Sequence, residues 1–165
     1  MILDSSYFVG ELLIAGIAGS SPAQVSMKSE LDWFIAVYEK QYLRLLLGDA
    51  FYEDFMADQE EDTPVYGTLK DLIYDENFIL SPVAGYVYYF YMRNSNTQTT
   101  ALNQIRTTPE NGAAYNNLDK MAKAWNLMVD LSTEIWDHLC NNALDYLLFD
   151  SSRTFPFEKI NTWNI

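Results

Sequence analysis

Residues Leu31 to Phe55 read LDWFIAVYEKQYLRLLLGDAFYEDF and carry the clearest helical pattern in the chain. Apolar side chains recur there at the steps of three and four that define one helix face: Leu31, Phe34, Ile35, Tyr38, Tyr42, Leu45 and Leu46. Ser21-Pro22 places proline where a first helical turn tolerates it, and Gln24 completes the spacing of a capping box. Ser29 stands where the N-cap of the clearest helix is expected, and Gly48 stands where a left-handed C-cap ends a helix. The pattern predicts a helix over residues 29–47 and a second helix over Asp49–Asp58.

Three further segments favour helices. Thr63-Pro64 and Ser81-Pro82 place proline where a first helical turn tolerates it. The segment VAGYVYYFYMRN, residues 83–94, is apolar on every side, which is typical of a central helix. Residues 117–149 repeat apolar side chains every seven positions and predict the longest helix. We therefore expect a mainly α fold, a compact bundle of four to five helices.

A length of 165 residues fits one domain, 1–165. Within it we expect an extended N-terminal arm over residues 1–28, a helical body over 29–149 and an extended C-terminal tail over 150–165. Residues 94–114 interrupt the body with a stretch rich in Asn, Thr and Gln, which predicts a long polar loop or a small β-hairpin.

The composition excludes several classes of function. Asp and Glu total 23 against 10 Lys and Arg, and the net charge of −13 opposes binding to a phosphate backbone. Cys140 is the only cysteine and His138 the only histidine, which excludes a disulfide framework and cysteine-based or multi-histidine metal centres. The start of the chain lacks the basic region of a signal peptide, and no apolar run approaches the roughly 20 residues of a membrane span. We expect a soluble, intracellular protein with no membrane partner.

Most of the negative charge lies in one block, residues 49–76, which holds 10 acidic residues and a single basic one. One interpretation is a solvated helix face and loop, and the other is a surface that faces a channel or a basic partner. The residues singled out by the second interpretation are Asp54, Asp58, Glu60, Glu61 and Asp62. Asp58, Glu60 and Asp62 alternate as in a calcium loop, but Thr63 replaces the turn glycine and Leu69 the closing acid, so we expect no metal site.

Candidates for catalysis are poor. Glu134 and His138 stand four residues apart in the predicted long helix, where a local polar pair is the simplest interpretation. Cys140 follows apolar Leu139 in the same helix, as is typical of a buried, inert thiol. The chain has no glycine-rich phosphate loop, G-x-S-x-G elbow or Rossmann fingerprint. We therefore expect no enzymatic activity, no catalytic residue and no cofactor.

Both ends of the chain are apolar without helical periodicity. The apolar residues concerned are Phe8, Leu12 and Ile14 in the arm, and Phe155, Phe157, Ile160, Trp163 and Ile165 in the tail. A tail of this kind either packs on its own domain or inserts into another chain. We hypothesise that arm and tail are assembly interfaces. On this hypothesis, a deletion that ends the chain at Asp150 would leave the unfolding of the isolated subunit nearly unchanged.

Residues 31–55 resemble the opening helices of head–tail connector (adaptor) proteins of tailed bacteriophages, most closely the type found in phages that infect Bacteroidetes. That pattern has an apolar-aromatic helix with Tyr-Glu and Tyr-Leu pairs, then Leu-Leu-Gly and an aromatic-acidic second helix. The residues that match it are Phe34, Tyr38, Glu39, Tyr42, Leu46 and Gly48, followed by Phe51 and Tyr52. The acidic block at Asp58 to Asp62 is heavier than the pattern requires.

The resemblance implies a structural virion protein without enzymatic activity. Such subunits join a ring beneath the portal, often of about twelve copies, which links the capsid to the tail and lines the DNA conduit. The implied partners are copies of the chain itself, the portal protein, and tail or further neck proteins, with DNA passing through unbound. The implied location is the virion neck at the portal vertex, and the host cytoplasm during assembly.

A small, acidic, aromatic-rich protein also fits a different class, the DNA mimics that inhibit nucleic-acid-binding proteins. Mimics usually spread their carboxylates over a surface at phosphate-like spacing. Here most of the net charge falls in residues 49–76, which favours the connector over the mimic. A negative conduit lining would also let DNA slide without sticking.

Overall fold

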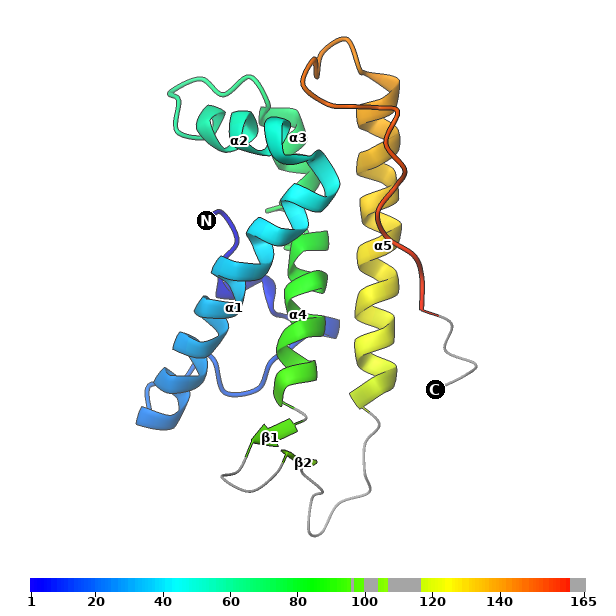
Figure 1. Ribbon diagram of the computed structural model, residues 1–165. Coiled ribbons are helices and arrows are strands. Elements are labelled where there is room, and N and C mark those ends of the chain that lie inside the picture. Colours follow the sequence, from blue (N-terminus) through cyan, green and yellow to red (C-terminus); the bar gives the residue numbers. More distant parts are fainter. Residues whose placement is uncertain (96, 100–103, 107–116, 161–165) are drawn as a thin grey trace.

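The computed structural model describes residues 1–95, 97–99, 104–106 and 117–160. Its elements in chain order are η1 (Ser5–Tyr7), η2 (Gly10–Leu12), α1 (Pro22–Leu47), α2 (Asp49–Asp58), α3 (Gly67–Ile73), α4 (Pro82–Ser95), β1 (Thr97–Thr99), β2 (Gln104–Arg106) and α5 (Asn117–Asn141). The described chain is mainly helical, as the sequence predicts (Figure 1).

Helix α1 begins at Pro22, inside the segment expected to be an extended arm, so the predicted start near Ser29 is wrong. The reason is a complete capping box, in which Ser21 accepts the Gln24 backbone N–H and the Gln24 side chain accepts that of Ser21. The predicted end is confirmed. Gly48 closes α1 with a φ of +85°, a conformation that favours glycine, and leads directly into α2.

Helix α4 is the centre of the bundle and packs against both α1 and α5 (Figure 1). Every residue from Pro82 to Tyr88 is buried, which confirms the expectation of a central helix. Gly85 sets the approach to α5, because a Cβ at that position would lie 3.0 Å from Met128 Cβ and 3.1 Å from the Ala124 carbonyl oxygen.

Replacing Gly85 with alanine is expected to lower the free energy of unfolding by about 1–3 kcal/mol, because α4 and α5 must move apart to fit the methyl group. The matched control is Gly67→Ala, since a Cβ at Gly67 meets nothing within 4 Å. Urea unfolding of both variants measures the difference. Equal stability of the two variants would show that the contact between the helices gives way freely.

Helix α5 ends at Asn141, so the predicted extension to Phe149 is wrong. The Asn142 side chain donates to the His138 carbonyl at 2.8 Å and satisfies part of the last turn. The chain then reverses through residues 142–149 and buries Tyr146 and Phe149 near Phe51. A continued helix would have carried both rings away from that contact.

Of the two alternatives for residues 94–114, a long polar loop or a small hairpin, the described residues form a hairpin. Strands β1 and β2 pair antiparallel, with Thr97 opposite Arg106 and Thr99 opposite Gln104. The other residues of the 94–114 stretch beyond Ser95 lie outside the described residues.

Candidate assembly surface

The N-terminal arm is tied to the bundle by the buried carboxylate of Glu39, a residue of α1. Its Oε1 accepts the backbone N–H of Ile2 at 3.0 Å, the N–H of Leu3 at 2.7 Å and the hydroxyl of Tyr74 at 2.8 Å. Glu39 is only 4% exposed. Burial raises the pKa of Tyr74 well above its usual value, and the charge of Glu39 adds to the shift. One carboxylate thus joins the arm, α1 and the end of α3.

The arm packs on its own bundle. Phe8, Leu12 and Ile14 are buried in the core, and the Tyr7 ring meets the Tyr74 ring edge-on at 6.5 Å. The prediction that these three side chains form an assembly interface is therefore wrong for the folded subunit, because a buried side chain has no surface left for a neighbour. The arm's apolar residues lack helical periodicity because they sit on short 3₁₀ turns and bends.

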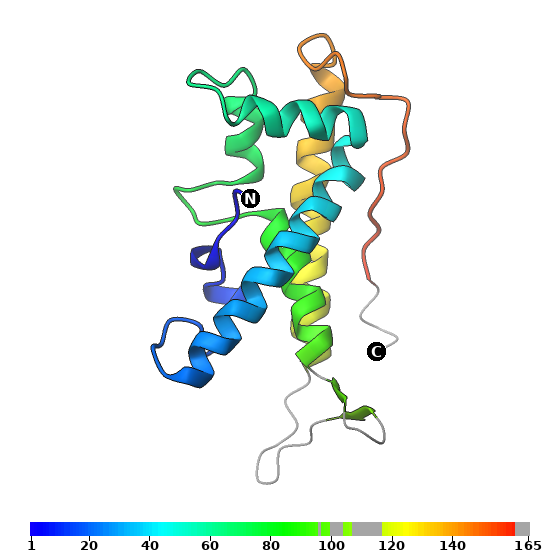
Figure 2. The same ribbon diagram turned by 60° about the vertical axis from the view of Figure 1, so that its left-hand side comes forward.

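The C-terminal tail runs back along the bundle as an extended strap over residues 150–160 (Figures 1 and 2). Side chains of α5 hold its backbone. Trp125 Nε1 donates to the Glu158 carbonyl at 2.8 Å. The amide of Asn126 donates to the Ile160 carbonyl at 3.0 Å and accepts the Ile160 N–H at 2.8 Å. This pair of hydrogen bonds resembles the bonds that a neighbouring strand would make, so the backbone of the tail at Ile160 is satisfied without one.

The tail also completes the aromatic core. Phe157 is buried, stacks on Tyr42 with ring centroids 5.2 Å apart, and Phe155 meets Trp136 at 5.6 Å. Of the two alternatives for the tail, the structure has it on its own domain as far as Ile160. The assembly role predicted for Phe155, Phe157 and Ile160 is corrected accordingly, since all three are buried or half-buried here. Trp163 and Ile165 lie outside the described residues.

The five residues of the acidic block divide into two groups. Asp58 accepts the backbone N–H of Val65 at 2.7 Å and of Tyr66 at 2.9 Å, and Asp54 accepts the Tyr66 hydroxyl at 2.6 Å. These two carboxylates hold the loop between α2 and α3. Glu60, Glu61 and Asp62 are exposed at the tip of that loop. The first group is structural, and only the second group is presented to a partner or to solvent.

The bond to Asp54 raises the pKa of Tyr66 to about 12, with burial adding to the shift. Because the unfolded phenol ionises near 10.0, Tyr66 contributes its full stabilisation below that pH and loses it as the pH rises towards about 12. We expect Asp54→Asn to lower the pKa of Tyr66, measured from the ultraviolet absorbance of the phenolate against Tyr66→Phe. Glu61→Gln is the control, and an equal shift in that variant would contradict a local cause.

Two loops at the α2 end of the molecule expose large apolar side chains. Loop residues 59–66 and 142–149 both lie at the top of the view in Figure 1. Val65 is 80% exposed, Leu144 90% and Leu147 82%. Large apolar side chains exposed on two loops at the same end of a folded chain favour an interaction surface there.

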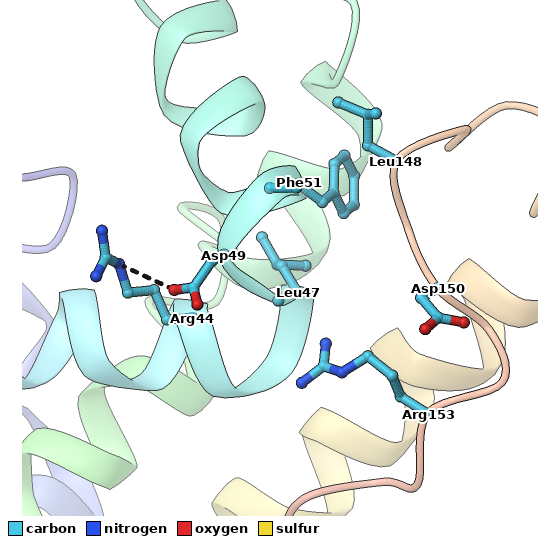
Figure 3. A pocket seen from close by; sticks show the side chains of 9 residues that line it. Arg44, Leu47, Asp49, Phe51, Leu148, Asp150 and Arg153 are labelled. Carbon is cyan, nitrogen blue, oxygen red and sulfur yellow. Dashed lines mark ion pairs between the residues drawn. The ribbon is translucent and has the colours of Figure 1, made fainter.

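A pocket of about 300 Å³ lies where α1 meets α2 and the tail begins (Figure 3). Its apolar lining residues are Leu47, Phe51 and Leu148, of which only Leu148 is exposed, and its charged lining residues are Arg44, Asp49, Asp150 and Arg153. The Arg44 guanidinium is already paired, since its Nε lies 3.6 Å from an Asp49 oxygen and its Nη2 donates to Glu53 at 2.5 Å.

Arg153 has a different role in the same pocket. Its guanidinium donates to the Leu45 carbonyl at 2.9 Å and to the Leu46 carbonyl at 3.5 Å, where α1 ends. A cation at a helix C-terminus is favoured by the helix dipole. Within the described residues, no carboxylate lies at ion-pair distance from Arg153. The hydrogen bonds from Ser152, and after them the charge of Arg153, lower the pKa of the Asp150 carboxyl, so opposite charges interact at this pocket.

The residues that carry the family resemblance form the buried seam of α1. Phe34 and Leu46 are buried, and Tyr38 stacks on Phe34 with ring centroids 5.5 Å apart. Tyr42 shares a 2.6 Å hydrogen bond with the hydroxyl of Ser132 on α5, and burial raises its pKa well above the usual value. These residues, with Glu39 and Gly48, maintain the fold and do not form a ligand site.

The weak catalytic candidates have local roles. His138 Nε2 lies 3.0 Å from the Tyr146 hydroxyl, and its Nδ1 lies 3.4 Å from the Asn142 amide. Glu134 is exposed, and Cys140 is half-buried as a free thiol. In residues 1–95 and 117–160, no three His, Cys, Asp or Glu side chains gather where they could hold a metal ion.

Sequence reasoning missed three residues that matter for the surface: Asn126, Arg153 and Phe78. Arg153 left a signal, as a cation at the start of an aromatic tail, which suits a helix C-terminus. Phe78 follows Asp75 by three residues, a spacing that allows an Asx turn with an outward tip. Asn126 left no signal, because its partner is 34 residues away.

Comparison with known proteins gives no relative: no family model, curated protein or solved structure matches the chain. Among the described helices, none combines the length and the apolar character that crossing a bilayer requires.

Proposed function

We propose that the protein is a structural virion subunit, a head–tail connector that forms a ring beneath the portal and links the capsid to the tail. The proposal rests first on the resemblance of residues 31–55 to that family. It is supported by the exposed apolar side chains at the α2 end, above all Leu144 and Leu147. A subunit that keeps its arm and tail packed and still exposes such side chains gains stability by covering them in an assembly.

The acidic loop tip has a role in this proposal. Glu60, Glu61 and Asp62 stand beside the apolar loops at the same end, so a partner that covers this end would carry basic side chains around an apolar centre. If these carboxylates line the DNA conduit instead, their negative charge repels the DNA phosphates. Whether they face a partner protein or the conduit, these carboxylates do not bind DNA.

The test is native mass spectrometry of the purified chain, alone and with the portal protein of the same phage. We expect a closed ring of defined copy number that associates with the portal, and loss of portal association in the double variant Leu144→Ser, Leu147→Ser. A chain that stays monomeric with the portal present, and blocks a nuclease at equimolar ratio, would overturn the proposal in favour of the DNA mimic.

A further inference from the structure

Helix α1 exposes two large apolar side chains on the face that points away from the bundle. Trp33 is 59% exposed and Val37 is 40% exposed. Helix α1 lies at the edge of the bundle, packed against α4 (Figure 1). Because its buried side chains face the bundle, Trp33 and Val37 lie on the opposite side of the helix. A tryptophan ring this exposed, beside a second apolar side chain, is the kind of surface that a partner stabilises most by covering it.

Trp33 and Val37 belong to a longer seam on this outer face. The residues of the seam follow one another at steps of three, four and three, and all four are exposed: Glu30, Trp33, Val37 and Lys40. Side chains at this spacing form the narrow stripe by which two helices pack side by side in a coiled coil. Arg44 continues the spacing, but it is already paired with Asp49 and Glu53, so the seam ends at Lys40.

The two ends of the seam carry opposite charges that a partner can reach. Among the described residues, no carboxylate lies at ion-pair distance from Lys40. The Glu30 carboxylate accepts one hydrogen bond, from the Asn94 amide at 3.2 Å. Because a carboxylate has lone pairs for several donors, this bond leaves room for a cation. A stripe with an apolar middle, an acidic end and a basic end is complementary to the same stripe turned end for end.

The charges select one orientation and one register for two such seams. In an antiparallel pair with its two-fold axis level with Ile35, Trp33 lies against Val37 of the other copy. The same axis sets Glu30 against Lys40 at both ends. A parallel pair would set Lys40 against Lys40 and Glu30 against Glu30, and these like charges repel. Sliding one helix by a heptad would set Trp33 against Glu30 or Val37 against Lys40 and would lose the apolar contact.

We infer that two copies of the free chain pair antiparallel through this outer face of α1. Trp33 of each copy packs on Val37 of the other. The Glu30 carboxylate of each copy faces the Lys40 ammonium group of the other. The contact uses the same surface on both copies, so it closes at two. The pair therefore does not depend on the proposed ring, and it is the form of the chain before it meets the portal. The apolar loops at the α2 end take no part in the contact.

The first test compares Trp33→Ser with Leu13→Ser, which removes an apolar side chain of equal exposure, 59%, from the arm. Sedimentation of the wild type over a range of concentrations, without the portal, is expected to show a reversible dimer. Trp33→Ser is expected to weaken the dimer by at least about thirtyfold, as for an interface hot spot, whereas Leu13→Ser leaves it unchanged. Circular dichroism shows that helix content is retained. A wild type that stays monomeric, or an assembly that Trp33→Ser leaves intact, overturns the inference.

The second test reverses the charges of the seam. Lys40→Glu alone and Glu30→Lys alone each place like charges at both ends of the pair, and each is expected to weaken it by about fivefold or more. The double variant Glu30→Lys, Lys40→Glu makes the charges opposite again and is expected to recover the wild-type affinity. Lys28→Glu is the control for net charge, since Lys28 is exposed on α1 outside the seam. A double variant as weak as the single variants would show that these charges do not meet.

A cross-link tests the position of the two-fold axis. Ala36 is exposed and stands one position from Ile35, so its two copies lie close together in the pair. In a Cys140→Ala background, Ala36→Cys is expected to give a disulfide-linked dimer on mild oxidation. Gln41→Cys is the matched control, since its two copies lie about 18 Å apart along the helices, beyond the roughly 7 Å between Cα atoms that a disulfide allows. Equal linking in both variants overturns the inference. A linked dimer from a chain that never associates with the portal supports the pair and defeats the proposed function.

Discussion

Replacing Glu39 with alanine is expected to lower the free energy of unfolding by about 3–5 kcal/mol. The change removes the one acceptor shared by the N–H groups of Ile2 and Leu3 and the Tyr74 hydroxyl. Burying donors without partners costs more than the hydrogen bonds themselves contribute. Denaturant unfolding measures the loss, and we expect residues 1–17 to become sensitive to limited proteolysis.

Two comparisons make this prediction specific. Glu39→Gln keeps the size and one acceptor oxygen, so we expect a loss smaller than that of the alanine variant. Lys40→Ala changes the adjacent exposed residue of α1 and is expected to stay within about 0.5 kcal/mol of the wild type. A loss below about 1 kcal/mol in Glu39→Ala would mean that water replaces the carboxylate and that the arm is not anchored there.

Replacing Phe157 with alanine is expected to cost about 3–5 kcal/mol, because the ring is buried between Tyr42 and Trp125. A chain ending at Asp150 loses this ring, the contact of Phe155 with Trp136 and the bonds of Arg153 to α1. We therefore expect that deletion to destabilise the isolated subunit, the reverse of what the sequence led us to predict.

Glu158→Ala is the control for the tail, since Trp125 binds the backbone carbonyl of that residue and not its side chain. Its thermal unfolding is expected to match the wild type. If Phe157→Ala unfolds at the same temperature as Glu158→Ala, the tail is only loosely held, and the assembly role first assigned to it regains support.

The helices could be predicted from the sequence because their signals are local. The apolar spacing from Leu31 to Leu46 gave the face of α1, and Gly48 gave its end. The start was missed in favour of Ser29, although Ser21 and Gln24 form a complete cap, since both serines offer the same local signal. The end of α5 was missed for a related reason, because the apolar residues at 143–149 continue the heptad spacing beyond the last helical turn.

The surface of the protein was decided by tertiary contacts. In the sequence, Phe8 and Phe157 cannot be distinguished from exposed side chains that anchor a chain to a partner. Only the distant residues that surround them show that they are buried in the subunit's own core. Glu39 meets Leu3 across 36 residues, and Arg153 meets Leu45 across 108. Phe78, in contrast, is apolar and yet exposed, since the bonds of its own loop turn it outward. Helical periodicity shows which side chains share one face of a helix, because it depends on residues within a turn or two along the chain. A segment without periodicity carries no such signal, and its burial depends on the residues from distant parts of the chain that pack against it.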